Sequence, residues 1–434
     1  MRSVLRRPNF SLLVAGQTVS QFGDKLQYMA LIALVGAGVS SGRGGLELAK
    51  LSVVFTAPVV LFGPLAGALV DRWNRRLTLI ICDALRALLV AGIPAVYQLS
   101  GRLWPVYVIS FCVFLLGTFF NAAKMSLIPD LVPHGELLPA NAAMTFVGRV
   151  ATVGGIVGGG VIMSSSLWPR IGLANYAAGF YLDAASYVIS VLCLIGIVLV
   201  MWRGHEKEHH HHASARAPAL VKRSMKGLVQ DVRVTISVVT RTPGLRFVFG
   251  SLILLALFAS TVYVAMTVSV QTVMGRGTAG VGYMGGILAG GMVLGSFLVG
   301  SLGHRWPREK LIGWGIGTIG VLMVFAGAFF SFRMFAPVAF VGGALLAPVM
   351  VAQDTMLHEF APRDARGVVF STKDLVVAAV FACSAFVVGG GVYLLDRLGV
   401  REPYRLALVI VGGMISLAAV AGQIAVQRRR TTAA

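Results

Sequence analysis

Long apolar runs separated by short polar segments dominate the chain from one end to the other. A run of about 17 to 25 apolar residues is long enough for a helix to cross a bilayer. Twelve such runs are predicted, at roughly 9–39, 46–70, 77–97, 103–127, 139–165, 172–201, 244–272, 278–302, 309–331, 333–357, 366–395 and 404–427. We expect helices throughout, because a backbone in lipid must satisfy its hydrogen bonds within its own segment.

The pattern repeats once, at an offset of about 230 residues. The stretches 67–76 (GALVDRWNRR) and 300–309 (GSLGHRWPRE) share Gly, Leu, Arg, Trp and Arg at matching positions. The loops at 128–133 and 357–362 both follow the fourth run of their half, and each has an acid followed three residues later by Pro. The repeat predicts an all-α membrane protein of twelve transmembrane helices, arranged as two six-helix pseudo-repeats around a central cavity.

The predicted domains are an N-terminal six-helix bundle over 1–202, a cytoplasmic linker over 203–243 and a C-terminal six-helix bundle over 244–434. Apolar and basic residues each recur at helical spacing over 220–233, which predicts an amphipathic helix on the cytoplasmic surface. Four consecutive histidines, His209 to His212, are a composition that binds transition metals. They lie in a polar linker without fixed neighbours, so no metal site or cofactor is assigned.

The first hairpin resembles the G-x-x-x-D-R-x-G-R-R signature between the second and third helices of the major facilitator superfamily of transporters, with Asn74 in place of the usual Gly. That resemblance implies a latch that closes the cytoplasmic side, in which an acid accepts hydrogen bonds from the start of a helix. In the second copy His304 replaces the acid, which implies a weaker or pH-sensitive latch. The candidate gate residues are Asp71, Arg72, Arg75, Arg76, His304, Arg305 and Arg308.

Further motifs, mostly in the first half, resemble a bacterial branch of the superfamily that includes macrolide-type drug pumps and enterobactin exporters and, more distantly, lysophospholipid transporters. The residues that carry the resemblance are Gly16-Gln17, Ser20, Gly23-Asp24, Asp71 to Arg76, Ile128 to Val132, Ala140 to Ala142, Phe180 to Asp183 and Ser186-Tyr187. The glycines at 154–160 resemble the superfamily's antiporter motif, with Gly155 where Pro is usual, and they also suit close helix packing.

Composition narrows the class of protein. The chain is 57% apolar and 12% charged, whereas a soluble protein is about 25% charged. Its net charge of +20 is spread over short hairpins, which indicates anionic lipid as the partner and not nucleic acid. Most of the 37 Lys and Arg residues fall in the termini and in the loops on one side, which predicts that both termini lie in the cytoplasm. The resemblance to the bacterial branch implies a location in the bacterial inner membrane. The four cysteines lie in separate apolar runs and predict free thiols.

Charges inside a membrane are costly, so they mark candidate functional sites. Polar residues recur on one face of the first span, and burial of the Asp24 carboxyl favours its protonated form. Lys25 beside it either neutralises Asp24 or points away. On the fifth span, Arg149 either attracts an anionic substrate group or pairs with Asp183. Asp83 and Arg86, spaced i, i+3, are expected to be structural partners.

The candidate proton carriers are Asp24 and, second, Asp183. The candidate cavity residues are Gln17, Gln21, Asp24, Tyr28, Asn141, Thr145, Arg149, Tyr263, Thr267 and Gln271.

The resulting hypothesis is a secondary active transporter, a monomer that exports small amphipathic molecules in exchange for protons by alternating access. Movement of lysophospholipid between leaflets is an alternative. So is divalent metal export, because Gly23-Asp24 also resembles the first-span Gly-Asp of ferroportins. From another class, a membrane sensor without transport remains open. No nucleotide-binding loop, zinc-protease motif or nucleophile elbow occurs, so an enzyme is not expected.

Overall fold

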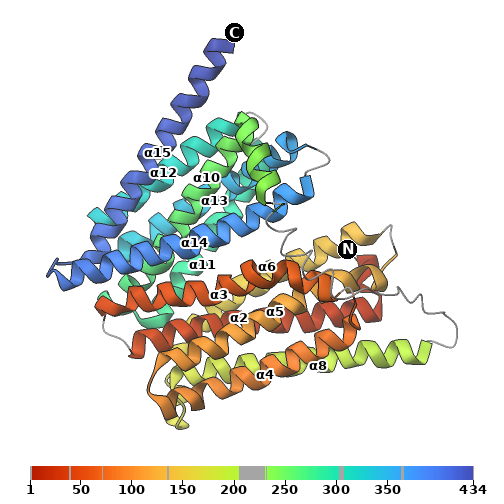
Figure 1. Cartoon of the computed structure of the whole chain (residues 1–434). Coiled ribbons are helices and arrows are strands. Elements are labelled where there is room, and N and C mark those ends of the chain that lie inside the picture. Colours follow the sequence, from red (N-terminus) through yellow and green to blue (C-terminus); the bar gives the residue numbers. More distant parts are fainter. Residues whose placement is uncertain are drawn as a thin grey trace. The chain divides into compact units, whose positions relative to one another are not determined.

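The computed structural model describes residues 2–38, 41–70, 72–133, 136–204, 230, 232–302, 307–362 and 366–433. Within these ranges the chain is helical and contains no strand (Figure 1). Most of the linker predicted over 203–243 lies outside the described residues, as do the histidine tract and most of the predicted amphipathic segment. The end of that linker, 232–241, is helical.

Each of the six apolar runs of the first half forms one long helix. These helices are α2 (Pro8–Gly38), α3 (Ser41–Val70), α4 (Arg75–Ser100), α5 (Leu103–Leu131), α6 (Leu137–Met163) and α8 (Asn175–Gly204). Two short helices, α1 (Arg2–Leu5) and α7 (Leu167–Arg170), flank them and are too short for the hydrophobic pattern to reveal.

The second half repeats this arrangement with one departure. Its long helices are α10 (Pro243–Thr261), α11 (Gly277–Leu302), α12 (Arg308–Ala328), α13 (Phe332–Phe360), α14 (Arg366–Arg397) and α15 (Pro403–Ala433). After α10 the seventh span continues as two π-helical turns, η2 (Val262–Met266) and η3 (Ser269–Val273). The Met274 N–H closes the second of these turns by donating to the Ser269 carbonyl at 2.8 Å. Such turns disrupt regular helix geometry, and they occur frequently at functional sites.

Eleven helices in the described part of the chain are long and apolar enough to cross a membrane. The twelfth long helix, α2, is not among them. It has the length, but Gln17, Gln21, Asp24, Lys25 and Gln27 make its middle polar. The predicted all-α, twelve-helix architecture is confirmed, and the exception is the helix that carries the first polar stripe.

The helices group into two compact units. Unit 1 comprises Met1–Leu34 and Val54–Leu228, and unit 2 comprises Val35–Val53 and Val229–Ala434. The segment Val35–Val53, which includes the end of α2 and the start of α3, therefore groups with unit 2, although it precedes most of unit 1 in sequence. It contacts α15 of that unit, where the Tyr404 hydroxyl accepts a hydrogen bond from the Gly45 N–H at 3.1 Å.

Equivalent helices pack in equivalent ways inside each unit. In unit 1, the third span α4 packs on the fourth, α5, and on the sixth, α8 (Figure 1). In unit 2, the ninth span α12 packs on the tenth, α13, and on the twelfth, α15. The internal sequence repeat therefore corresponds to a repeat of helix packing.

The two repeated loop motifs also meet in space within each half. The Arg75 guanidinium lies 2.8 Å from the Asp130 carboxylate and also donates to the Ser126 carbonyl at 2.9 Å. At the same repeat positions of the second half, Arg308 pairs with Glu359. The hairpin and the acid-x-x-Pro loop, recognised separately in the sequence, thus form one ion pair per half.

Glycines let several helix pairs approach until backbone meets backbone. In unit 2, a Cβ added at Gly343 of α13 would lie 2.1 Å from the Leu288 carbonyl oxygen of α11. In unit 1, a Cβ at Gly155 of α6 would lie 2.6 Å from Lys25 Cβ and 2.8 Å from the Phe22 carbonyl oxygen of α2. Glycine in the Gly154–Gly160 stretch therefore permits close helix packing, which is one of the two explanations expected from the sequence.

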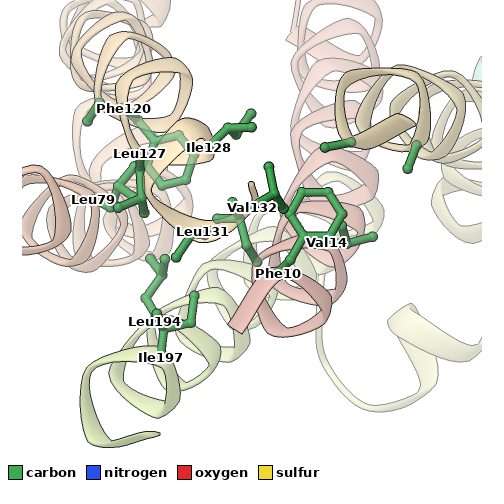
Figure 2. Packing of buried hydrophobic residues seen from close by; sticks show 14 of the residues in the cluster. Phe10, Val14, Leu79, Phe120, Leu127, Ile128, Leu131, Val132, Leu194 and Ile197 are labelled. Carbon is green, nitrogen blue, oxygen red and sulfur yellow. The ribbon is translucent and has the colours of Figure 1, made fainter. Parts of the chain in front are cut away.

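An apolar cluster fills unit 1 beside the start of α2. It joins Phe10 and Val14 of α2 with residues of α4, α5 and α8, among them Leu79, Leu127 and Leu194 (Figure 2). Phe120 and Cys82 belong to the same cluster and lie next to the charged residues described below. This packing removes water from one side of those charges.

We predict that Gly343→Ala destabilises the protein by about 1 to 3 kcal/mol, because a methyl group against a backbone carbonyl forces α11 and α13 apart. The neighbouring Gly342 offers a matched control, since a Cβ there meets no atom within 4 Å. Gly342→Ala should be neutral or stabilising by up to about 1 kcal/mol through helix propensity. Thermal unfolding of the two variants in detergent measures the difference, and equal melting temperatures would contradict this packing.

Candidate functional site

A buried arginine of α4 connects several charged side chains inside unit 1. Arg86 Nη2 donates to Asp24 Oδ1 of α2 at 2.7 Å, and Nη1 donates to Asp83 Oδ1 at 3.2 Å. The Arg86 and Asp83 side chains are 6% and 0% exposed, whereas that of Asp24 is 29% exposed. Arg86 therefore joins an enclosed carboxylate to an accessible one.

Tyr187 of α8 completes the contacts of Asp24. Its hydroxyl donates a hydrogen bond to the same Oδ1 atom that Arg86 contacts. The Arg86 guanidinium carbon lies 4.1 Å from the centroid of the Tyr187 ring and 5.9 Å from that of Phe120. Cation–π contacts of this kind gain strength where water is excluded. Both rings therefore lie within cation–π distance of the guanidinium.

Asp183 lies one turn away on α8 and is fully buried. The Ser186 hydroxyl lies 3.1 Å from its Oδ1 atom, while Oδ2 has no hydrogen-bond partner in the described structure. The first span approaches closely here, because a Cβ at Gly23 would lie 2.4 Å from Asp183 Oδ1. Gly23 thus has a steric reason to be glycine, since a side chain would displace Asp183 and Ser186.

A second buried cation belongs to the same region. Lys124 of α5 is 6% exposed, and its ammonium donates to Asn121 Oδ1 at 2.8 Å. It interacts electrostatically with Asp24 and Asp83, without a direct ion pair to either. We call Asp24, Asp83, Arg86, Lys124 and Asp183 the charge cluster. It holds three carboxyls and two cations, and it carries one excess negative charge when all five groups are ionised.

The first-span stripe predicted to line a cavity separates into different environments. Gln17 is buried, and its amide nitrogen lies 3.5 Å from Ser20 Oγ. Gln21 faces α6, where Gly148 leaves room for its amide oxygen. The Tyr28 ring lies 5.5 Å from the ring of Phe55. Of the four predicted residues, Asp24 alone enters the charge cluster, so their common helical face does not make a common site.

Two alternatives left open by the sequence are decided by contacts. Lys25 packs its side-chain stem beside Gly155 of α6, and Asp24 pairs with Arg86 instead. Arg149 is exposed and Asp183 is buried, and no ion pair joins them among the described residues. Asn141 and Thr145 are exposed on α6 like Arg149. The role of the fifth-span stripe as a set of cavity residues stays a prediction.

The seventh-span candidates coincide with the π-helical turns. Tyr263 lies in η2, Gln271 lies in η3, and Thr267 lies between the turns. All three are buried within unit 2. The Tyr263 ring lies 5.7 Å from that of Phe381, and the Gln271 amide lies 3.3 Å from Thr278 Oγ1. Their role as substrate contacts stays a prediction.

The candidate gate is described only in part. Asp71, His304 and Arg305 lie outside the described residues, whereas Arg72, Arg75, Arg76 and Arg308 lie within them. The Asn74 side chain caps α4 by accepting from the N–H groups of Arg76 and Leu77 at 3.1 and 3.2 Å. Asn at the position where the signature has Gly thus supplies an N-cap. Arg75 is fixed by Asp130, as described above.

The sequence analysis treated Asp83 and Arg86 as a pair distinct from Asp24, and it assigned no role to Tyr187. Comparison of the depths of these residues along their helices would have indicated that Arg86 and Asp24 can meet. Arg86 stands eleven residues into α4 and Asp24 sixteen residues into α2, so at 1.5 Å per residue both lie about 15 to 25 Å from a helix end. Charges at such depth need a partner. Which charge meets which depends on helix rotation, and the sequence does not show that.

Comparison with known proteins agrees with this architecture. A model of the Major Facilitator Superfamily matches residues 13–372. The uncharacterized transporter YfiS of Bacillus subtilis (strain 168) is 26% identical over 182 residues, which is 42% of this chain and 40% of that protein. The uncharacterized transporter Rv0037c of Mycobacterium tuberculosis (strain ATCC 25618 / H37Rv) is 29% identical over 150 residues, 35% of this chain and 34% of that protein. The matched region thus spans less than half of each relative.

Solved structures share the fold over almost the whole chain. An inward-facing, unoccupied bacterial homologue of the human lysosomal transporter Spinster has a TM-score of 0.69 at 14% identity, with 96% of each chain covered. An inward-facing bacterial homologue of the iron transporter ferroportin has a TM-score of 0.68 at 14% identity, with 95% of this chain and 98% of that chain covered. Because the family match extends over most of the sequence and agrees with the helical fold, the chain belongs to the major facilitator superfamily of membrane transporters.

Proposed function

We propose that this transporter exports small amphipathic molecules and is driven by protons, with Asp24 as the proton carrier. The observation that supports the proposal is the charge cluster of unit 1. Buried ionic groups are expensive in an apolar bundle and tend to mark ion pathways. Among the three carboxyls, Asp24 alone keeps accessible surface, so it is the one positioned to exchange a proton with water.

The charge balance suits a proton better than a metal ion. With all five groups ionised the cluster carries one excess negative charge, and a single proton removes it. A divalent cation at Asp24 would instead meet the Arg86 guanidinium, which lies 2.7 Å from that carboxylate. No group of three or more metal-ligand side chains occurs in the described residues. Divalent metal export is therefore the weaker alternative.

Unit 2 offers a different kind of chemistry. Its buried polar side chains in the described residues are all neutral hydroxyls and amides. Examples are Gln353, which donates to Ser251 at 2.9 Å, and Ser384, which donates to Ser260 at 2.7 Å. These buried groups satisfy one another, so they do not by themselves select a substrate. The proposal of drug-like or siderophore-like molecules, with a lysophospholipid as the alternative, rests on the resemblance of the first-half motifs to those transporters.

The predicted cellular setting is the bacterial inner membrane with both termini in the cytoplasm. The relatives named above are bacterial, and the Lys and Arg distribution favours this orientation. The hairpin of Asp71 to Arg76 would then face the cytoplasm. Its resemblance to the superfamily signature, together with the Arg75–Asp130 pair, supports a latch that closes this side.

We expect Asp24→Asn to fold and to bind substrate but to lose proton-driven export, because an amide cannot take up and release a proton. Flux in proteoliposomes with an imposed pH gradient measures this, with a panel of amphipathic compounds that includes a macrolide, a catecholate siderophore and a lysophospholipid. Gradient-driven flux should fall to the level of empty liposomes. The control, Asp374→Asn, removes an acid whose side chain is 79% exposed and should transport normally.

Full gradient-driven flux in Asp24→Asn would move the coupling role elsewhere, with Asp183 the next candidate. Flux of the lysophospholipid alone would favour the lipid alternative. Specific binding of panel compounds without flux in wild-type protein would favour a sensor.

The gate proposal has its own test. A hydrogen-bonded acid at a helix start contributes about 1 to 2 kcal/mol, so Asp71→Asn should raise the ratio of inward-open to outward-open protein by a factor of about 5 to 30. The measurement is the labelling rate of a cysteine introduced at the exposed Thr145, using a membrane-impermeant thiol reagent in inside-out vesicles. Glu402→Gln, which removes an acid from a different loop, is the control. An unchanged labelling rate in Asp71→Asn would contradict the proposed latch role of Asp71.

A further inference from the structure

The two terminal nitrogens of the Arg86 guanidinium donate hydrogen bonds to two acids on different helices. Nη1 faces Asp83, three residues away on the same helix, at 3.2 Å, and Nη2 faces Asp24 of α2 at 2.7 Å. The first contact is enclosed, because Asp83 has no exposed side-chain surface. The second contact reaches the accessible carboxyl. The two ion pairs therefore differ in how easily each can be broken.

The surroundings of Arg86 favour retention of the guanidinium if its bond to Asp24 breaks. The Tyr187 ring lies against it at 4.1 Å, and Asp83 keeps it paired, so the loss of Asp24 does not leave a buried cation without a partner. Its Nε atom has no hydrogen-bond partner in the described structure, so the group has spare donor capacity. A buried arginine with one permanent and one releasable carboxylate is suited to a change of charge at the releasable one.

We infer that Arg86 is the positioning residue for coupling. It pairs with Asp24 while the Asp24 carboxyl is ionised, releases Asp24 when that carboxyl takes up a proton, and remains paired with Asp83 throughout. This inference rests on the proposed proton-coupled function and adds the residue that sets the proton affinity of its carrier. Arg86 was expected only to be a structural partner of Asp83.

The sign of its effect follows from the charges that face Asp24. From α4 these are Arg86 and Asp83, from α5 Lys124, and from α8 Asp183 and the Tyr187 hydroxyl. From α6, which packs on α2, the basic residue is the exposed Arg149. On α2 itself, Lys25 directs its stem toward Gly155. Loss of Arg86 removes the nearest cation and leaves two nearby carboxylates, so Asp24 should hold its proton up to a higher pH.

The test needs no transported substrate. Infrared spectra of the purified protein in nanodiscs, titrated from acid to alkaline pH, follow the carbonyl band of protonated carboxyls. Subtraction of the same titration with Asp24→Asn in the matching background isolates the Asp24 band. We expect Arg86→Gln to move the midpoint of this band to higher pH by about one unit or more, which is a tenfold or greater gain in proton affinity. Arg86→Lys should move it less, because an ammonium keeps the charge but lacks the planar fork that reaches both acids.

The matched control is Arg405→Gln. Arg405 also pairs with an acid three residues away, Glu402, at 2.9 Å, but this pair is exposed at the surface. Its loss should leave the Asp24 midpoint unchanged. If Arg86→Gln fails to fold because Asp83 is left unpaired, Arg86→Gln with Asp83→Asn removes that buried charge. The double variant still lacks the cation, so its midpoint should also lie above that of wild type.

Failure of this inference is separable from failure of the proposed function. A wild-type midpoint in the folded Arg86 variants would overturn the role of Arg86, and loss of proton-driven flux in Asp24→Asn would still stand. Conversely, normal proton-driven flux in Asp24→Asn would overturn the proposed function. Absence of any Asp24 band that titrates in wild type would overturn both.

Discussion

The ion pairs of Arg86 are the constraint around which unit 1 is organised. Ionised side chains in an apolar bundle are stable only when paired and hydrogen-bonded, and removal of one partner from a buried pair typically costs about 3 to 5 kcal/mol. Asp24, Asp83 and Tyr187 meet this requirement from three helices. The rotations of α2, α4 and α8 about their axes are thereby linked, because each must present its group to the same guanidinium.

Glycine and apolar packing make those ion pairs possible. Gly23 brings α2 against α8 where Asp183 and Ser186 lie, and Gly155 brings α6 against the opposite side of α2. The apolar cluster containing Phe120 and Cys82 excludes water next to Arg86. A low local dielectric strengthens each pair and raises the cost of an unpaired charge.

The two halves share a scaffold and differ in chemistry. Both have an ion pair at the equivalent hairpin, Arg75–Asp130 and Arg308–Glu359, and both pack the third helix of the half on the fourth and sixth. Buried charges occur in unit 1, whereas the buried polar groups that the structure describes in unit 2 are neutral. Duplication thus preserved the frame. The interior residues differ, with buried charged side chains in unit 1 and, among the described residues, neutral hydrogen-bonding side chains in unit 2.

The sequence by itself determined the membrane class, the number and approximate bounds of the long helices, and the duplication, because hydrophobic length and repeated motifs are local properties of the chain. It also singled out Asp24, since a charge within an apolar run is conspicuous in one dimension. Only the tertiary structure showed that Asp24 pairs with Arg86 and not with Lys25, and that no ion pair joins Asp183 to Arg149 among the described residues. It also showed that the seventh span becomes π-helical at Tyr263 and Gln271. Those outcomes depend on how each helix is rotated and how closely glycines let it approach its neighbours, and the energies that fix them come from contacts between residues distant in sequence.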